Sequence, residues 1–372
     1  MSISRSAHAF NFSSVEFWQA VWGFSAVIQA RKMKLRSRDV TKVYAEEEPE
    51  PEHEEAAPSA RTTTKRKPAR DYASEWPPGT TLTRACTYAY TLPGSDVPPL
   101  AVQEDSMATL NPKEYLDDVA LSAACESLHD RLPADARARA KAVAAFMQPQ
   151  YLAHMPAPHA AADAGHLLAP FDGRRSLVVV IIAIAGHYSF GAFFVRPSGE
   201  VALILHFDSL SVNRGGHHDG AVALAPLTEL LAGRRQQPPN SMPAVIRIPG
   251  TPQQPNLVDC GPYAVLAASK LINEAAAVAA AASAGDSGNS SGNSGGLLDV
   301  LVDLVPRLCA QGARPQDRAA AVAEEHRRGR LCDPTFLTKA WFTHQEAFGL
   351  RELVADELLA LVRRRGGTHG YI

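Results

Sequence analysis

The chain has 372 residues, 46% of them hydrophobic, which is enough to bury the core of one large domain or of two ordinary ones. Its formal net charge of −2 argues against a strongly basic surface for nucleic acid or an anionic membrane, and the apolar run at 177–185 is shorter than the roughly 20 residues needed to cross a bilayer. The five cysteines are irregularly spaced and form no CxxC pair, so neither a disulfide framework nor a zinc ribbon is indicated, and we expect a monomer in a reducing compartment.

The first 80 residues lack the pattern of a folded domain. Residues 1–35 are rich in aromatic residues, Ser and Arg and contain a single acid, Glu16, a composition typical of organelle transit peptides. A poorly structured leader, or translation from Met33, explains the same composition and is favoured. Residues 36–80 combine low hydrophobicity with blocks of like charge, which cannot offset chain entropy, so we expect a disordered extension over 1–80.

A basic segment of this extension bears on localisation. Lys65-Arg66-Lys67-Pro68 has the composition of a nuclear-import signal, although a solvated linker explains the same charges equally well. We expect the protein in the nucleus, the cytoplasm or both, with organelle targeting through residues 1–35 as the weaker alternative.

One folded domain is expected from 81 to 372. Apolar residues at helical spacing predict helices at 111–132 and 135–146, and further helices close the chain, ending with 345–363. A Val/Ile-rich run and alternating segments predict strands at 177–185, 188–195, 201–207 and 244–248. An Ala-rich and then Gly/Ser/Asn-rich tract at 275–296 predicts a flexible, low-complexity insertion at about 273–334.

Two polar residues stand where the predicted strands 188–195 and 201–207 bring their ends together. His187 precedes the first strand and Asp208 follows the second, and a turn at 196–200 makes the two strands antiparallel neighbours. The start of one therefore lies beside the end of the other. A histidine next to a carboxylate can serve as a base with an orienting partner. Taken singly, each has an ordinary explanation, as a structural histidine and as turn chemistry.

Cys260 stands just before a predicted helix start at Gly261-Pro262, where the helix dipole favours a thiolate. A lone cysteine is more often a small buried apolar residue, but a base and its partner on the same sheet edge favour a nucleophile. Gln254, six residues earlier, can donate to an oxyanion alongside the Cys260 backbone N–H. The sequence therefore predicts a cysteine-hydrolase site of His187, Asp208, Cys260 and Gln254, without a cofactor.

A second cluster, His217-His218-Asp219, invites a metal-site interpretation. It is flanked by glycines and has no cysteine near it, so a solvated loop is favoured and we expect no metal.

The motifs of the predicted site resemble those of the ubiquitin-like-protein proteases, the SUMO proteases and deneddylases related to the adenovirus protease. Gly186-His187-Tyr188-Ser189 resembles the family's His-Trp-Ser, and His206-Phe207-Asp208-Ser209-Leu210 resembles its Tyr-Tyr-Asp-Ser-Leu. Residues 254–261 are similar to Gln-x-Asn-Gly-x-Asp-Cys-Gly, and Tyr115-Leu116-Asp117-Asp118 is similar to Trp-Leu-Asn-Asp. Residues 342–346 with Arg351 resemble the C-terminal segment, so the resemblance spans about 81–270 and 335–365.

The resemblance implies an α+β papain-like fold, with a central mixed or antiparallel sheet flanked by helices and a triad in the order His, Asp, Cys. It implies cleavage after the C-terminal Gly-Gly of a ubiquitin-like modifier, SUMO above the others, for precursor maturation or deconjugation. Tyr115 and Tyr188 would then flank the diglycine. Asp117 and Asp118 would bind a basic residue of the modifier, although acidic residues are also ordinary at a helix start.

The sequence departs from the family pattern near the site. Both tryptophans that flank the diglycine are replaced, by Tyr115 and Tyr188, and Leu257 stands at the family's Gly. These changes leave two alternatives open: a catalytically weak or inactive module that binds a modifier, and an acyltransferase that uses the same triad. All four predicted catalytic residues are present, which favours the peptidase.

Overall fold

The computed structural model describes residues 70–84, 100–147, 149, 168–184, 187–210, 220–234, 242–285 and 296–364. By its internal contacts the chain divides into two units, Met1–Pro68 and Ala69–Ile372, and all described residues lie in the second. The leader at 1–35, the basic segment at 65–68 and the cluster His217-His218-Asp219 lie outside the described residues.

A five-stranded mixed sheet in the order β3-β4-β5-β6-β7 forms the centre of this unit. The pairs β4/β5 and β5/β6 are antiparallel, whereas β3 and β7 run parallel to their neighbours. The strands are β3 Ala144–Met147, β4 Leu177–Ile184, β5 His187–Val195, β6 Val201–Phe207 and β7 Val245–Arg247. A separate antiparallel pair joins β1 Leu82–Arg84 to β2 Leu100–Val102.

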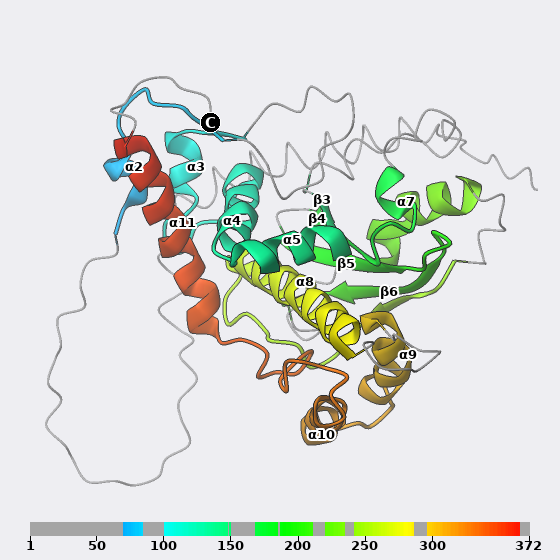
Figure 1. Ribbon diagram of the computed structural model, residues 1–372. Helices are drawn as coiled ribbons and strands as arrows, with labels where there is room; N and C mark the ends of the chain where they lie inside the picture. Colours follow the sequence, from blue (N-terminus) through cyan, green and yellow to red (C-terminus); the bar gives the residue numbers. More distant parts are fainter. Residues whose placement is uncertain are drawn as a thin grey trace, which may run out of the picture. The chain divides into compact units, whose positions relative to one another are not determined.

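Helices cover both faces of the sheet. Helix α8, Cys260–Gly285, lies across one face and α7, Gly220–Arg234, packs against β5 and β7 on the other (Figure 1). The described residues also form α2 Tyr72–Glu75, α3 Glu104–Ala108, α4 Asp118–Asp130, α5 Ala134–Val143, the 3-10 turn η2 Ala169–Phe171, α9 Leu297–Leu308, α10 Pro315–Arg327 and α11 His344–Arg364. The α+β papain-like protease fold expected from the sequence is confirmed.

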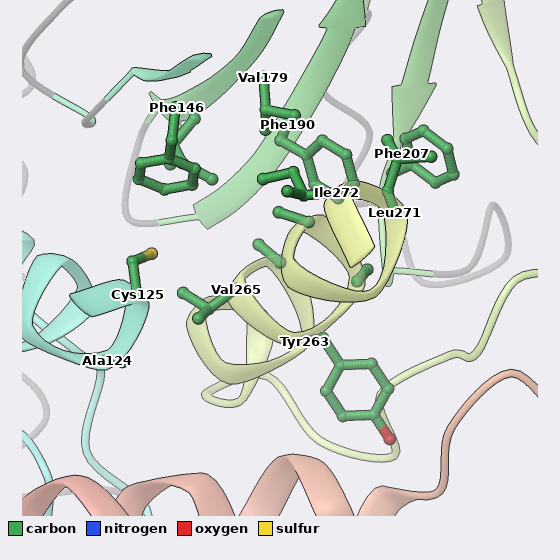
Figure 2. Close-up of a cluster of buried hydrophobic side chains, with 14 of the residues drawn as sticks. Ala124, Cys125, Phe146, Val179, Phe190, Phe207, Tyr263, Val265, Leu271 and Ile272 are labelled. Carbon is green, nitrogen blue, oxygen red and sulfur yellow. The ribbon is translucent and has the colours of Figure 1, made fainter. Parts of the chain in front are cut away.

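The continuous apolar run of β4 follows from burial on both sides. Successive side chains of a strand point to opposite faces, so Val179 and Ile181 join the core under α8 while Val178 and Val180 join the core under α7. Figure 2 shows the first of these cores, in which α8 meets the sheet on one side and α4 on another.

Helix α8 is the most apolar long helix of the described residues. The stretch Cys260–Ser283 is long and apolar enough, by length and composition alone, to cross a membrane. However, 56% of its apolar stretch is buried inside the fold, as in the core helix of a globular domain. Burial against the sheet, α4, α5 and α11 accounts for the same composition.

Four segments differ from the expectations. The helix expected at 111–132 begins only at Asp118, because Asp117 caps its N-terminus. Residues 144–147, expected to end a helix, form β3, because a parallel pairing with β4 outweighs local helix propensity. Tyr72 and Trp76, inside the predicted disordered extension, are buried in the core. In the predicted insertion, α8 continues to Gly285, and α9 and α10 follow with apolar faces packed inward. The exact limits of the domain and of the insertion stay predictions.

Candidate active site

The β5–β6 hairpin brings His187 and Asp208 together. His187 is the first residue of β5 and Asp208 follows the last residue of β6, with Phe190 opposite Phe207 in the antiparallel register. The ring Nε2 of His187 lies 2.8 Å from Asp208 Oδ1, and both side chains are buried. The predicted pairing of these two residues is therefore found in the fold.

Cys260 is the first residue of α8 and is fully buried. Its thiol is hydrogen-bonded to His187, and because Nε2 of the ring faces Asp208, Nδ1 is left for the sulfur. Burial lowers the pKa of His187, but the hydrogen bonds and charges of Asp208 and Cys260 outweigh it and raise this pKa to about 9. The imidazole of His187 and the N-terminus of α8 therefore both lie beside the Cys260 sulfur.

Asp208 is held by groups of the turn that follows it. Its Oδ1 also accepts a hydrogen bond from the backbone N–H of Leu210 at 2.9 Å, and Arg247 Nη2 lies 3.8 Å from its Oδ2. Burial raises the pKa of Asp208, but the bonds from His187 and Leu210 and the charges of His187 and Arg247 lower it overall. Asp208 is therefore held as a carboxylate facing a histidine.

Gln254 is fixed to the same turn. Its backbone N–H donates to Ser209 O at 3.0 Å, and its side-chain Oε1 accepts from Ser209 Oγ at 2.5 Å. Its Nε2 donates one hydrogen to Asn256 O at 2.6 Å, and a primary amide carries a second. The loop from Gln254 to Cys260 is therefore pinned at its start beside Asp208.

The same loop is pinned at its other end by Arg351 of α11. Asp259 Oδ1 accepts from Arg351 Nε at 3.2 Å and Nη2 at 3.1 Å, and its Oδ2 accepts from Asn256 Nδ2 at 2.7 Å. Arg351 is buried and also donates to three backbone carbonyls, those of Thr109, Glu114 and Val258. The role of Asp259 as an ion-pair partner was missed in the sequence, although a signal existed: Arg351 stands on the buried apolar stripe of α11.

Gly261 explains how the segment around Tyr115 approaches the nucleophile. A Cβ built on Gly261 would lie 3.0 Å from Leu116 Cδ1, so a larger residue would require the buried Leu116 side chain to shift by a few tenths of an ångström. This contact places Tyr115, the neighbour of Leu116, on the same side as the N-terminus of α8, packed partly against the core.

The two predicted substrate-binding acids, Asp117 and Asp118, make different contacts in the fold. Asp117 is the N-cap of α4 and accepts from Ala120 N at 2.6 Å, which is the ordinary role of an acid at a helix start. Asp118 instead accepts a hydrogen bond from the Tyr188 hydroxyl at 2.6 Å. Tyr188 follows His187 directly and is buried. The polar groups of Asp117 and Asp118 are thus engaged within the chain.

The segment that carries these residues is similar to a known protein family. Residues 163–278 match the family described as "Ulp1 protease family, C-terminal catalytic domain". Over this segment the chain is similar to the catalytic domain of the Ulp1 protease family. The matched segment contains His187, Asp208, Gln254 and Cys260, the four residues that the fold brings to one edge of the sheet. No curated protein matches the chain.

Solved structures give distant matches. A de-sumoylating protease is 15% identical with a TM-score of 0.46, covering 77% of this chain and 95% of its own. The Ulp1 protease domain in complex with Smt3, the yeast ortholog of SUMO, is 13% identical with a TM-score of 0.40, covering 76% and 87%. The Xanthomonas campestris effector XopD bound to ubiquitin is 19% identical with a TM-score of 0.32, covering 42% and 74%. At such values, substrate and activity must be argued from this chain's own residues.

Proposed function

We propose that the protein is a cysteine peptidase that cleaves after the C-terminal Gly-Gly of a ubiquitin-like modifier, with SUMO as the favoured modifier. The observation that carries the proposal is the chain of contacts from Asp208 to His187 at 2.8 Å and from His187 to Cys260 at the start of α8. The match of residues 163–278 to the Ulp1 protease family supports the reaction class. The resemblance of the site motifs to those of the SUMO proteases favours SUMO.

The reaction begins with the Cys260 sulfur, which attacks the carbonyl carbon of the terminal glycine. His187 holds the thiolate as an ion pair and then gives its proton to the leaving amine, which is a lysine side chain in a conjugate or a backbone amine in a precursor. Asp208 orients the ring through Nε2 and stabilises the imidazolium. Water, deprotonated by His187, then hydrolyses the thioester.

Gln254 and the start of α8 supply donors for the oxyanion. The second hydrogen on Gln254 Nε2 and the backbone N–H of Cys260, at a helix N-terminus, can both point to the oxygen that gains charge. Removing one such donor typically costs about 10²–10³ in kcat. Ser209 holds the amide by its carbonyl oxygen, so its orientation is set before substrate binds.

Tyr115 and Tyr188 define the approach to the sulfur for a narrow substrate. Tyr188 is adjacent to His187, and Tyr115 is the neighbour of Leu116, which packs beside Gly261. A tail without Cβ atoms suits a passage between flat rings, which supports Gly-Gly as the sequence before the scissile bond.

The rival proposal is a modifier-binding module that does not cut. It is favoured by one observation: Tyr188 stands where the family has tryptophan, and its hydroxyl is committed to Asp118. The two proposals differ in turnover, because only the peptidase converts a Gly-Gly-extended precursor to its mature form.

In the test, the full chain is incubated with the precursors of SUMO, of the deneddylase substrate and of ubiquitin, and with the matching lysine conjugates. We expect cleavage of the SUMO substrates, abolished in Cys260→Ala and retained in Cys125→Ala, which replaces a buried cysteine of α4 and serves as the matched control. Binding of a modifier by the wild-type protein without any cleavage would favour the rival module. Cleavage of another modifier alone would overturn the choice of SUMO and keep the peptidase.

A further inference from the structure

One oxygen of the Asp208 carboxylate lacks a hydrogen-bond donor in the part of the chain that the structure describes. Oδ1 accepts from His187 and from the Leu210 N–H, whereas Oδ2 is buried and accepts none. A buried carboxylate oxygen without a donor destabilises the ionised form, which the triad needs. A compensating charge nearby therefore has an unusually large effect on this residue.

Arg247 supplies that charge from β7. Its Nη2 lies 3.8 Å from Asp208 Oδ2 and donates to Leu210 O at 2.7 Å. The arginine is half-buried, so its charge is only partly screened. The guanidinium thus meets both ends of the turn 208–210, the carboxylate at its start and the carbonyl at its end.

That turn also carries the oxyanion residue. Ser209 holds Gln254 by two hydrogen bonds, and Gln253 Nε2 donates to Asp208 O at 3.3 Å. A displacement of the turn would therefore move the triad acid and the amide of Gln254 together. Arg247 reaches this turn from β7.

We propose that Arg247 is a positioning residue for the peptidase reaction, one that closes the turn 208–210 and keeps Asp208 ionised. The proposal rests on the proposed function and extends it beyond the triad and Gln254. Among the described residues, the charged groups that act on Asp208 are His187 on β5 and Arg247 on β7, and those that act on His187 are Asp208 and Cys260. Loss of Arg247 removes the only cation of this set that does not itself take part in proton transfer.

The test compares Arg247→Met and Arg247→Lys with wild type. For Arg247→Met we expect kcat for SUMO-precursor cleavage to fall about 10- to 100-fold with KM nearly unchanged, and the acid limb of the pH–kcat profile to move to higher pH. Arg247→Lys keeps the charge and should restore the acid limb and most of kcat. The matched control is Arg175→Met. Arg175 is half-buried and also donates to a backbone carbonyl, that of Lys141 at 3.2 Å. It precedes the end of β4 that pairs with Phe194, whereas the other end of β4 pairs with His187.

A second readout needs no substrate. Iodoacetamide alkylates the thiolate, so mass spectrometry of the Cys260 peptide against pH reports the Cys260–His187 pair even if no precursor is cleaved. An acid limb of alkylation that moves to higher pH in Arg247→Met and returns in Arg247→Lys supports the proposal. Unchanged limbs in Arg247→Met, or a loss of activity that only follows the fraction of unfolded protein, would overturn it. Failure of the proposed function is recognised separately, as wild-type protein that alkylates normally but cleaves nothing.

Discussion

The hydroxyl of Tyr188 donates to Asp118 Oδ1 at 2.6 Å and so joins the start of β5 to the first turn of α4. Burial raises the pKa of Asp118, an effect that the bond from Tyr188 partly offsets. Burial and the nearby charge of Asp118 also raise the pKa of the Tyr188 hydroxyl. The tyrosine that replaces the family's tryptophan therefore gains a polar anchor, which fixes the ring beside His187.

Removal of this anchor should be measurable in stability. Tyr188→Phe leaves the Asp118 carboxylate without its donor, and we expect a loss of about 1–3 kcal/mol in the free energy of unfolding. Urea unfolding measures it. The control is Tyr263→Phe, whose hydroxyl faces His344 Nδ1 across a longer 3.3 Å and whose loss should cost about 1 kcal/mol or less. Equal losses in the two variants would mean that the Tyr188–Asp118 hydrogen bond stabilises the fold no more than an ordinary neutral hydrogen bond.

The charged state of His187 predicts a dependence of stability on pH. Its pKa is raised from 6.5 to about 9 in the folded protein, so its contribution is fully present below about pH 6.5 and is lost as pH rises through about 9. For Asp208 the pKa is lowered, so its contribution is present above its unfolded value near 3.8 and is lost as pH falls through the folded pKa. Denaturant unfolding between pH 6 and roughly 10 should show the first loss in wild type and lack it in His187→Gln. Parallel curves for the two proteins would contradict the assignment.

The buried arginine of α11 should be one of the most sensitive positions. Arg351→Met removes the cation that faces Asp259 and the donor to three backbone carbonyls, and we expect a loss of about 3–5 kcal/mol. Arg351→Lys should not restore it, because an ammonium cannot reach the same acceptors. The control is Arg314→Met, which breaks an exposed pair with Asp317 and should change stability by less than about 1 kcal/mol. Thermal or urea unfolding of the three variants would refute this account if Arg351→Met proved as mild as Arg314→Met.

Gly261 should be sensitive to a single methyl group. In Gly261→Ala the new Cβ meets Leu116 at 3.0 Å, so Leu116 or the start of α8 must give by a few tenths of an ångström. We expect a loss of about 1–3 kcal/mol in the free energy of unfolding together with reduced Cys260 reactivity. Gly349→Ala, in the open interior of α11, meets nothing within 4 Å and should stabilise by about 0.5–1 kcal/mol. Urea unfolding and Cys260 alkylation of both variants test this prediction. It is contradicted if Gly261→Ala changes neither the free energy of unfolding nor the reactivity of Cys260.

Local patterns predicted the parts of the site that depend on neighbours in sequence. The hairpin of β5 and β6 follows from alternation and the turn at 196–200, and it alone brings His187 to Asp208. The helix start after Asp259 follows from Gly261-Pro262 and places Cys260 at an N-terminus. These features are short-range, so the residues that decide them stand close together in the chain.

Contacts between distant segments were not predictable in the same way. Strand β3 exists because it pairs in parallel with β4 across a connection of 29 residues, from 148 to 176, which no local pattern reports. The ion pair of Arg351 with Asp259 joins residues 92 positions apart. Arg247 was expected only as a strand residue, since its approach to Asp208 depends on the parallel pairing of β6 with β7.

The most direct measurement is the intact mass of the protein after incubation with SUMO that carries a C-terminal electrophile. We expect the mass of the wild-type protein to increase by that of one SUMO adduct. The mass of Cys260→Ala should not change, and Cys125→Ala should form a normal adduct. The deneddylase-substrate and ubiquitin probes should give little or none. Folded wild-type protein that forms no adduct with any of the three probes would contradict the peptidase assignment.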